Sequence, residues 1–367
     1  MKNQKVVLPL IVIIAVIVWY VAVNTSQPGT SSGPIKIGVI LPLTGDLAVT
    51  GEKIFNGFQI AQAELANKNI QFIVEDSHSK PGDAVSAVSK LLNVDGVSLI
   101  IGTYSPDETL AVAPLAKDKG ENVFSFSFCS DSFKEYDNVF CAYPNASHQL
   151  DTVIPVVKSK GVKTMALVNQ NSDFGLNSRD AMKSKTSIGG YTIVLDELVS
   201  GGQSDYRTTA AKVIASKADG VFTAADNPID ALKITSELYQ LGFKGTRITF
   251  VDVDNKNLQQ FGTSVEGTLA PGIAPSQFSS AFGLAYKAKF GSDPDYTAAL
   301  GYDITRYVIG TLKKENWSAD SLTANVLDYK YPDPAIAGFR FLQDRTVVYQ
   351  LELQVAKSGK YTKYITE

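Results

Sequence analysis

The 367-residue sequence has little of the chemistry on which most enzymes depend, because it contains only two histidines and two cysteines. No Gly-x-Ser-x-Gly elbow joins a strand to a helix, and neither a P-loop nor a His-Glu-x-x-His pair is present. His78 and His148 both stand in polar stretches, where a solvated side chain is the ordinary outcome. We therefore expect a protein that is not an enzyme and needs neither a cofactor nor a metal.

The chain also lacks an excess of positive charge. The net charge is −3, and the first 33 residues hold Lys2 and Lys5 but no acid, so the remainder of the chain carries −5. A domain that binds nucleic acid would present a basic surface. The charge balance therefore excludes nucleic acid as the expected partner.

Long apolar runs are limited to one, "VVLPLIVIIAVIVWYVAV" at residues 6–23. A helix of this length reaches about 27 Å, enough to span a bilayer core. Residues 1–23 are predicted to be a transmembrane anchor or a signal segment, and either one exports the rest of the chain. The run lacks a convincing cleavage site, which favours an uncleaved anchor in the cell membrane over export after signal cleavage. Residues 24–33, rich in Ser, Thr, Gly and Pro, are predicted to be a flexible linker.

The two cysteines, Cys129 and Cys141, are separated by a polar stretch that is typical of a turn. In an exported protein they could form a disulfide that closes this loop. The alternative is a pair of free buried thiols, and the sequence leaves both possibilities open.

Apolar strands and amphipathic helices alternate along most of the chain, which predicts an α/β fold with parallel sheets and helices on both faces. The alternation runs from residue 35 to residue 127 and restarts near residue 164, which indicates two similar units rather than one large sheet. The closing segment alternates like a pair of antiparallel strands with a turn at Ser358 and Gly359.

One strand-to-helix turn stands out, "IIGTYSPDETLAVAP" at residues 100–114. Ser105 is a good N-cap, Pro106 fits the first helical position, and Glu108 completes a capping box. Backbone N–H groups at such a turn face the carboxyl end of a strand, which is where open α/β sheets bind ligands. The alternative is a well-capped helix without a binding role.

Several motifs in order resemble a known family: "IKIGVILPLTGDLAVTGEKIFNGFQIAQAE", "SLIIGTYSPDETLAVAPLAKDKG", "DFG" and "DYTAALGYD". The chain resembles the type I periplasmic solute-binding proteins, in particular the leucine/isoleucine/valine-binding receptors of ABC transporters. The resemblance implies two doubly wound Rossmann-like lobes joined by three crossovers. Lobe 1 would comprise residues 34–144 and 274–345, and lobe 2 residues 145–273 and 346–367. It further implies capture of an amino acid or amide-like solute, with the ABC permease and ATPase as separate chains.

The resemblance also implies which residues line the ligand site. Ser105 matches a hydroxyl that holds the ligand's carboxylate, and Pro106 replaces a small polar residue beside it. Phe174 matches an aromatic residue that covers the ligand. The remaining implied positions are Thr50 in the first loop, Ser127, Phe128 and Cys129 after the fourth strand, Asp226 after a strand of the second unit, and Asp252, which would meet an ammonium group.

Acidic residues complicate this picture, because Asp107 and Glu108 stand in the turn that would bind a carboxylate. If these two and Asp226 and Asp252 all face the cleft, a neutral or cationic ligand fits better than a simple branched-chain amino acid. If Asp107 and Glu108 point out to solvent instead, a zwitterion still fits, and the sequence leaves both possibilities open. Two other functions remain open: a sensor ectodomain of the same fold that signals to a partner, and a hydrolase on a doubly wound sheet.

Overall fold

The computed structural model describes residues 33–65, 69–129, 131–250, 255–273, 278–315, 317, 319 and 322–365. The apolar run at residues 6–23 and nearly all of the predicted linker lie outside the described residues, as does Asp252. Within the described part of the chain, no helix is both long enough and apolar enough to cross a membrane.

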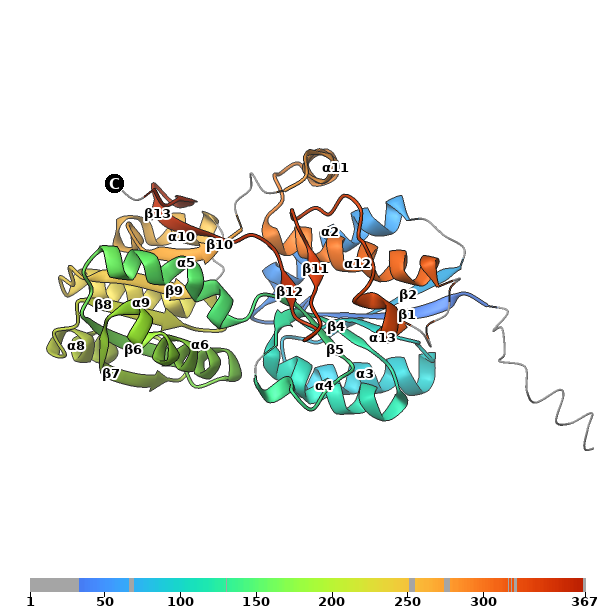
Figure 1. Cartoon of the computed structure of the whole chain (residues 1–367), viewed down its shortest axis with the longest axis horizontal. Helices are drawn as coiled ribbons and strands as arrows, with labels where there is room; N and C mark the ends of the chain where they lie inside the picture. Colours follow the sequence, from blue (N-terminus) through green and yellow to red (C-terminus); the bar gives the residue numbers. More distant parts are fainter. Residues whose placement is uncertain are drawn as a thin grey trace, which may run out of the picture. The chain divides into compact units, whose positions relative to one another are not determined.

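The first sheet has five parallel strands in the order β2-β1-β3-β4-β5. Alternate residues of β1 face opposite sides: Ile37 and Val39 join one core cluster and Ile40 joins another. Helices α3 and α4 cover one face, and α2 and α12 cover the other (Figure 1). These elements are β1 (Ile35–Leu41), α2 (Ala48–Glu64), β2 (Ile70–Asp76), α3 (Pro81–Lys90), η1 (Leu91–Asp95), β3 (Ile100–Gly102), α4 (Pro106–Lys119), β4 (Val123–Phe128), η2 (Asp131–Phe133), β5 (Val139–Tyr143) and α12 (Tyr296–Lys314).

Helices α2 and α12 approach closely because each has a glycine at the crossing. A Cβ on Gly57 would lie 1.8 Å from the carbonyl oxygen of Ala298, and a Cβ on Gly301 would lie 2.1 Å from that of Ile54. Any side chain at either position would push the helices apart. The glycines inside these two helices are therefore a packing feature that brings α12, and with it Tyr296, against the first sheet.

The second sheet has seven strands in the order β14-β13-β10-β9-β8-β6-β7. It is parallel from β7 to β10, and β13 and β14 add an antiparallel hairpin whose predicted turn at Ser358 and Gly359 is confirmed. The core on one face includes residues of α5 and α6, and the core on the other face includes residues of α8 and α9. These elements are α5 (Ala146–Ser159), β6 (Thr164–Gln170), α6 (Asp173–Ser184), α7 (Thr186–Gly189), β7 (Thr192–Val199), α8 (Arg207–Ala215), β8 (Gly220–Ala224), α9 (Pro228–Gln240), β9 (Thr246–Phe250), α10 (Asn255–Phe261), η3 (Gly262–Val265), β10 (Leu269–Gly272), β13 (Glu352–Lys357) and β14 (Lys360–Lys363).

The chain passes between the two sheets three times. It leaves the first sheet after β5, returns after β10 through α11 (Ser280–Phe290), α12 and α13 (Leu322–Val326), and leaves again after β12. Strand β12 (Val347–Val348) pairs with β11 (Arg340–Phe341), and Thr346 bridges to Cys141 of β5. The last passage therefore falls between Val348 and Glu352. The lobe boundaries at 144, 273 and 345 stay predictions.

Candidate functional site

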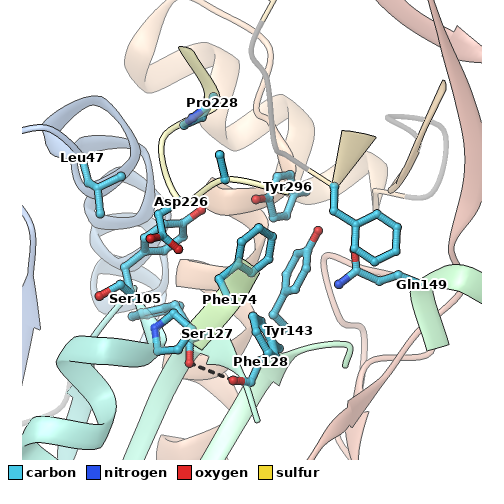
Figure 2. A pocket seen from close by; sticks show the side chains of 15 residues that line it. Leu47, Ser105, Ser127, Phe128, Tyr143, Gln149, Phe174, Asp226, Pro228 and Tyr296 are labelled. Atoms are coloured by element: carbon cyan, nitrogen blue, oxygen red, sulfur yellow. Dashed lines mark hydrogen bonds between the residues drawn. The ribbon is translucent and has the colours of Figure 1, made fainter. Parts of the chain in front are cut away.

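The carboxyl ends of strands from both sheets line one cleft. Its volume is about 600 Å³, including space open to solvent, and Figure 2 shows the side chains that surround it. The first-sheet side supplies the turn after β3 and the ends of β4 and β5, and the second-sheet side supplies the segments after β6 and β8 and the end of β9. The lining residues are Leu47, Tyr104, Ser105, Pro106, Phe126, Ser127, Phe128, Tyr143, Gln149, Phe174, Ala225, Asp226, Pro228, Phe250 and Tyr296.

Most of the residues named from the sequence lie in this cleft. Six of them are lining residues: Ser105, Pro106, Ser127, Phe128, Phe174 and Asp226. Thr50 and Cys129 are not among the lining residues, and Asp252 lies outside the described residues. Helix α2 begins at Ala48, so Thr50 lies in its first turn and not in a loop as expected from the sequence.

The turn from β3 to α4 has the capping geometry that its sequence predicts. The N–H of Glu108 donates to Ser105 Oγ at 3.2 Å, and the N–H of Ser105 donates to Glu108 Oε2 at 3.3 Å. Pro106 fills the first helical position and has no N–H to offer. The capping box therefore engages two backbone donors that would otherwise point toward the cleft.

A chain of hydroxyl groups connects this turn to strand β4. Thr109 Oγ1 lies 2.8 Å from Ser125 Oγ, which also accepts from the N–H of Ser127 at 3.0 Å. The hydroxyl of Ser127 donates to the carbonyl oxygen of Phe128 at 3.1 Å. The polar groups at the end of β4 thus satisfy one another inside the protein.

The disulfide alternative is confirmed, because Cys129 and Cys141 are bonded to each other with their Cα atoms 5.5 Å apart. The bond ties the end of β4 to the neighbouring strand β5. Phe128 immediately precedes Cys129, so the disulfide holds the segment that presents this ring to the cleft.

Contacts between side chains join the two sides of the cleft. The rings of Phe128, the last residue of β4, and Phe174, in the first turn of α6, lie with their centroids 5.4 Å apart. The hydroxyl of Ser132 donates to Asp173 Oδ1 at 2.9 Å. The structure therefore places the two sheets on either side of a partly closed cleft.

Aromatic residues dominate the lining, and the sequence analysis named only two of them. Tyr143 and Tyr296 lie with their ring centroids 5.7 Å apart and face the same space as Phe174 (Figure 2). Gln149, buried in α5, donates from its amide to the carbonyl oxygen of Pro144. Tyr296 lies within the motif "DYTAALGYD", so that motif could have indicated it. The other aromatic lining residues that the sequence analysis missed are Tyr104, Phe126 and Phe250.

Asp226 supplies a carboxylate to the cleft. Gln170 fixes its position, because the Gln170 amide donates to Asp226 Oδ2 at 2.7 Å and accepts from the Asp226 N–H at 3.1 Å. Burial, together with the charges of Asp107, Asp173 and Asp230, raises the pKa of Asp226 to about 6, and a hydrogen bond from Ser172 opposes this rise. The carboxyl group thus sits in an acidic environment that disfavours its ionised form.

The two acidic residues of the turn, Asp107 and Glu108, differ in burial and in hydrogen bonding. Glu108 is fully buried and turned back into the capping box, and burial raises its pKa. Asp107 remains exposed, and desolvation together with the charge of Asp173 raises the pKa of Asp107. The acidic character of the described cleft therefore comes from Asp107, Asp173 and Asp226, and Glu108 contributes to the structure of the turn.

Two open α/β sheets whose strand ends share one cleft define the bilobal binding proteins, a class that closes around ligands by hinge motion. The family model of periplasmic binding proteins matches residues 34–360. This chain belongs to the periplasmic binding protein family. The family is one of receptors and not of enzymes, so the hydrolase alternative loses its support.

Curated relatives agree with this assignment at low identity. The Leu/Ile/Val-binding protein BraC3 of Rhizobium johnstonii is 24% identical over 242 residues, which cover 64% of this chain and 65% of the relative. The Leu/Ile/Val-binding protein homolog 3 of Brucella melitensis is 23% identical over 246 residues, 64% of this chain and 66% of the relative. The matched stretch thus spans slightly less than two thirds of these relatives.

Solved structures share the fold over nearly the whole described chain. The leucine-binding protein LivK of Thermotoga maritima has a TM-score of 0.82 at 20% identity and covers 90% of this chain and 98% of its own. The isoleucine-bound LivJ of Streptococcus pneumoniae has a TM-score of 0.77 at 22% identity, covering 89% and 97%. A benzoate-bound solute-binding protein of an ABC transporter from R. palustris has a TM-score of 0.80 at 19% identity, covering 90% and 95%.

Proposed function

We propose that this protein is the extracytoplasmic receptor of an ABC importer and captures a small solute in the cleft between its two sheets. The supporting observation is that lining residues come from both sheets, with Phe128 and Phe174 in contact across the cleft. A ligand in this position contacts both sides at once. It therefore stabilises the closed arrangement over the open one by its extra contacts.

The importer's permease and ATPase are separate chains in this proposal. Closure brings the surfaces of the two lobes into one fixed arrangement, which a permease can distinguish from the open form. We further propose that residues 6–23 anchor the protein in the cell membrane, with residues 24–33 as a tether. The support for the anchor is the length of the uncharged run and the lysines that precede it.

Thermal-shift screening of the full-length protein in a nonionic detergent tests the binding function. A ligand present at 100 times its dissociation constant should add about 2.7 kcal/mol to the free energy of unfolding. The hits should lose this effect in Leu47→Trp, because a larger side chain at the half-buried Leu47 fills part of the cleft.

Leu284→Trp is the matched control, because Leu284 is 70% exposed on α11 and away from the lining residues. It should respond to the hits as the unchanged protein does. A hit that stabilises Leu47→Trp as strongly as the unchanged protein binds elsewhere and contradicts the proposal.

A further inference from the structure

We propose that the cleft selects small organic ammonium ions that carry an apolar or aromatic body and no carboxylate, with Asp226 as their counter-charge. This inference rests on the proposed binding function and specifies its ligand class. Three features of the described cleft support it: the sign of its charges, the nature of its walls, and the engagement of its hydrogen-bond donors.

The charges of the cleft are of one sign. Among the lining residues that the structure describes, Asp226 is the only charged side chain, and none is lysine, arginine or histidine. No ion pair joins Asp226 to a basic side chain within the described residues, and its hydrogen-bond partner Gln170 is neutral. A half-buried carboxylate without a cation beside it carries a desolvation cost, and a bound ammonium group would supply the missing charge.

The neighbouring acids reinforce this preference. Asp107 and Asp173 lie close enough to raise the pKa of Asp226 through their charges. Asp230, in the first turn of α9, does the same, although Lys233 Nζ lies 3.7 Å from its Oδ1. An anion that entered the cleft would meet repulsion from this group of carboxylates, and a cation would meet attraction.

The walls suit a cation with an apolar body. Seven of the fifteen lining residues are aromatic. Figure 2 shows the rings of Phe174, Tyr143 and Tyr296 gathered around one space, with Phe128 beside them and Asp226 at its edge. Aromatic faces attract ammonium groups, and they do so most strongly where water is excluded. The same faces pack against an alkyl or phenyl group, so both ends of such a ligand are accommodated.

The donors that would hold a carboxylate are largely engaged within the protein. In the turn before α4, the capping box uses the N–H groups of Ser105 and Glu108, and Pro106 has none. At the end of β4, the N–H and hydroxyl of Ser127 both donate to protein acceptors. The Ser105 hydroxyl hydrogen-bonds to the Glu108 carboxylate, so the donor that remains at this turn is the N–H of Asp107, a residue with a carboxylate of its own. A carboxylate ligand would therefore lose its hydrogen bonds to water and gain few from the protein. It would also lie near the negative charge of Asp107.

Calorimetric titration with matched probes tests the ligand class on the full-length protein at neutral pH. Phenethylamine and phenylalanine differ only by a carboxylate, as do 3-methylbutylamine and leucine, and phenethyl alcohol replaces the ammonium of phenethylamine by a neutral group. Each amine should bind at least about tenfold more tightly than its amino acid, and phenethylamine at least about tenfold more tightly than the alcohol. Benzoate completes the series as an anion with the same ring.

Two variants distinguish the contribution of the Asp226 charge to binding from that of the aromatic lining residues. Asp226→Asn should reduce the preference for phenethylamine over its alcohol at least about tenfold. Phe174→Leu keeps an apolar surface but removes a ring, so it should lower the affinity for phenethylamine more than the affinity for phenethyl alcohol. Asp118→Asn is the matched control, because it removes one negative charge at the exposed end of α4, about 17 Å from Asp107 along the helix axis. It should leave every affinity unchanged.

The outcomes distinguish this inference from the function on which it rests. If phenylalanine, leucine or benzoate binds as tightly as the amines, the cationic preference is wrong and the binding function stands. Amine binding that is indifferent to both Asp226→Asn and Phe174→Leu also overturns the inference. If no probe binds, the ligand class is contradicted, and the thermal-shift screen with Leu47→Trp decides the binding function separately.

Discussion

Phe128 and Phe174 meet across the cleft with ring centroids 5.4 Å apart: Phe128 ends β4 of the first sheet, and Phe174 lies in α6, which follows β6 of the second sheet. The pair therefore lines the cleft and also links its two sides directly. An aromatic pair in this arrangement contributes about 0.5–1.5 kcal/mol beyond the area it buries. The same contact favours the closed form in the absence of ligand and becomes part of the wall in its presence.

Phe174→Ala should therefore open the unliganded protein and weaken ligand binding at the same time. The open form becomes more populated because the ring contact and its buried area are lost. Small-angle scattering should show a larger radius of gyration without ligand, and calorimetry should show an affinity for phenethylamine lower by about tenfold. Leu284→Ala, at an exposed position, should change neither quantity. Unchanged scattering with unchanged affinity in Phe174→Ala would show that the ring contact has no part in closure.

Binding of an ammonium ligand should strengthen as the pH rises through the pKa of Asp226, which burial and the charges of Asp107, Asp173 and Asp230 raise from 3.8 to about 6. Below this pH the free protein holds a proton that the ligand must displace. The affinity for phenethylamine should rise by up to about tenfold per pH unit below pH 6 and level off above pH 7. The amine stays charged throughout, because its pKa is close to that of lysine.

The same shift affects stability in the opposite direction. Because the folded protein favours the protonated form of Asp226, its contribution to the free energy of unfolding falls as the pH rises from about 4 to about 6. Asp226→Asn should remove the pH dependence of both the affinity and the free energy of unfolding, and Asp118→Asn should keep both. Titrations at pH 5, 6, 7 and 8 measure the pH dependence of the affinity. A flat affinity profile in the unchanged protein would exclude Asp226 as the counter-charge.

The strand-helix alternation allowed the fold to be predicted because it depends on local apolar patterns, and the capping box was predictable because three neighbouring residues define it. Ser105, Pro106, Ser127, Phe128, Phe174 and Asp226 could be placed in the cleft because the resemblance to the type I solute-binding proteins implied these positions, and the strand ends that carry them meet at one edge. Tyr143 and Phe250 were missed for a physical reason. Each follows an ordinary apolar strand pattern, and only the packing of the two sheets decides that its ring faces the cleft.

The start of α2 illustrates a second limit of prediction from the sequence. The stretch before Gly51 has the composition of a loop, yet the helix begins at Ala48. Gly51 lies where a Cβ would come 2.1 Å from the carbonyl oxygen of Pro42, so this glycine serves close packing and does not mark a break in the helix. Close approach of distant backbone segments is a tertiary property, which local sequence does not encode.

Removal of the disulfide should lower stability and loosen the segment that carries Phe128. Cys129 and Cys141 are 12 residues apart, and a loop of this size confers about 3 kcal/mol by restricting the unfolded chain. The double variant Cys129→Ser with Cys141→Ser should unfold at a lower temperature and bind phenethylamine more weakly. Reductant should lower the unfolding temperature of the unchanged protein and leave that of the double variant alone. Equal unfolding temperatures for the two proteins without reductant would contradict the expected role.

Among the acidic residues of the first-sheet core, Asp303 should be the one whose substitution lowers the free energy of unfolding most. It lies on α12 with no exposed surface, and its Oδ1 accepts from the Tyr331 hydroxyl at 2.8 Å and from the Ala335 N–H at 2.6 Å. Its Oδ2 accepts from the Ile336 N–H at 2.8 Å. The carboxyl group therefore fixes the segment that leads into β11 against the helix that carries Tyr296.

Asp303→Asn replaces one acceptor oxygen by an amide group that points its own hydrogens at a donor. At least one buried N–H or hydroxyl then lacks a partner, which costs about 1–3 kcal/mol in the free energy of unfolding. Asp328→Asn makes the same chemical change at an exposed position and should stay within about 0.5 kcal/mol of the unchanged protein. Chemical denaturation of the three proteins gives the comparison. Equal losses in the two variants would mean that the three hydrogen bonds of Asp303 add nothing to the stability of this core, and the attachment of the β11 segment would then depend on apolar packing around Tyr331 alone.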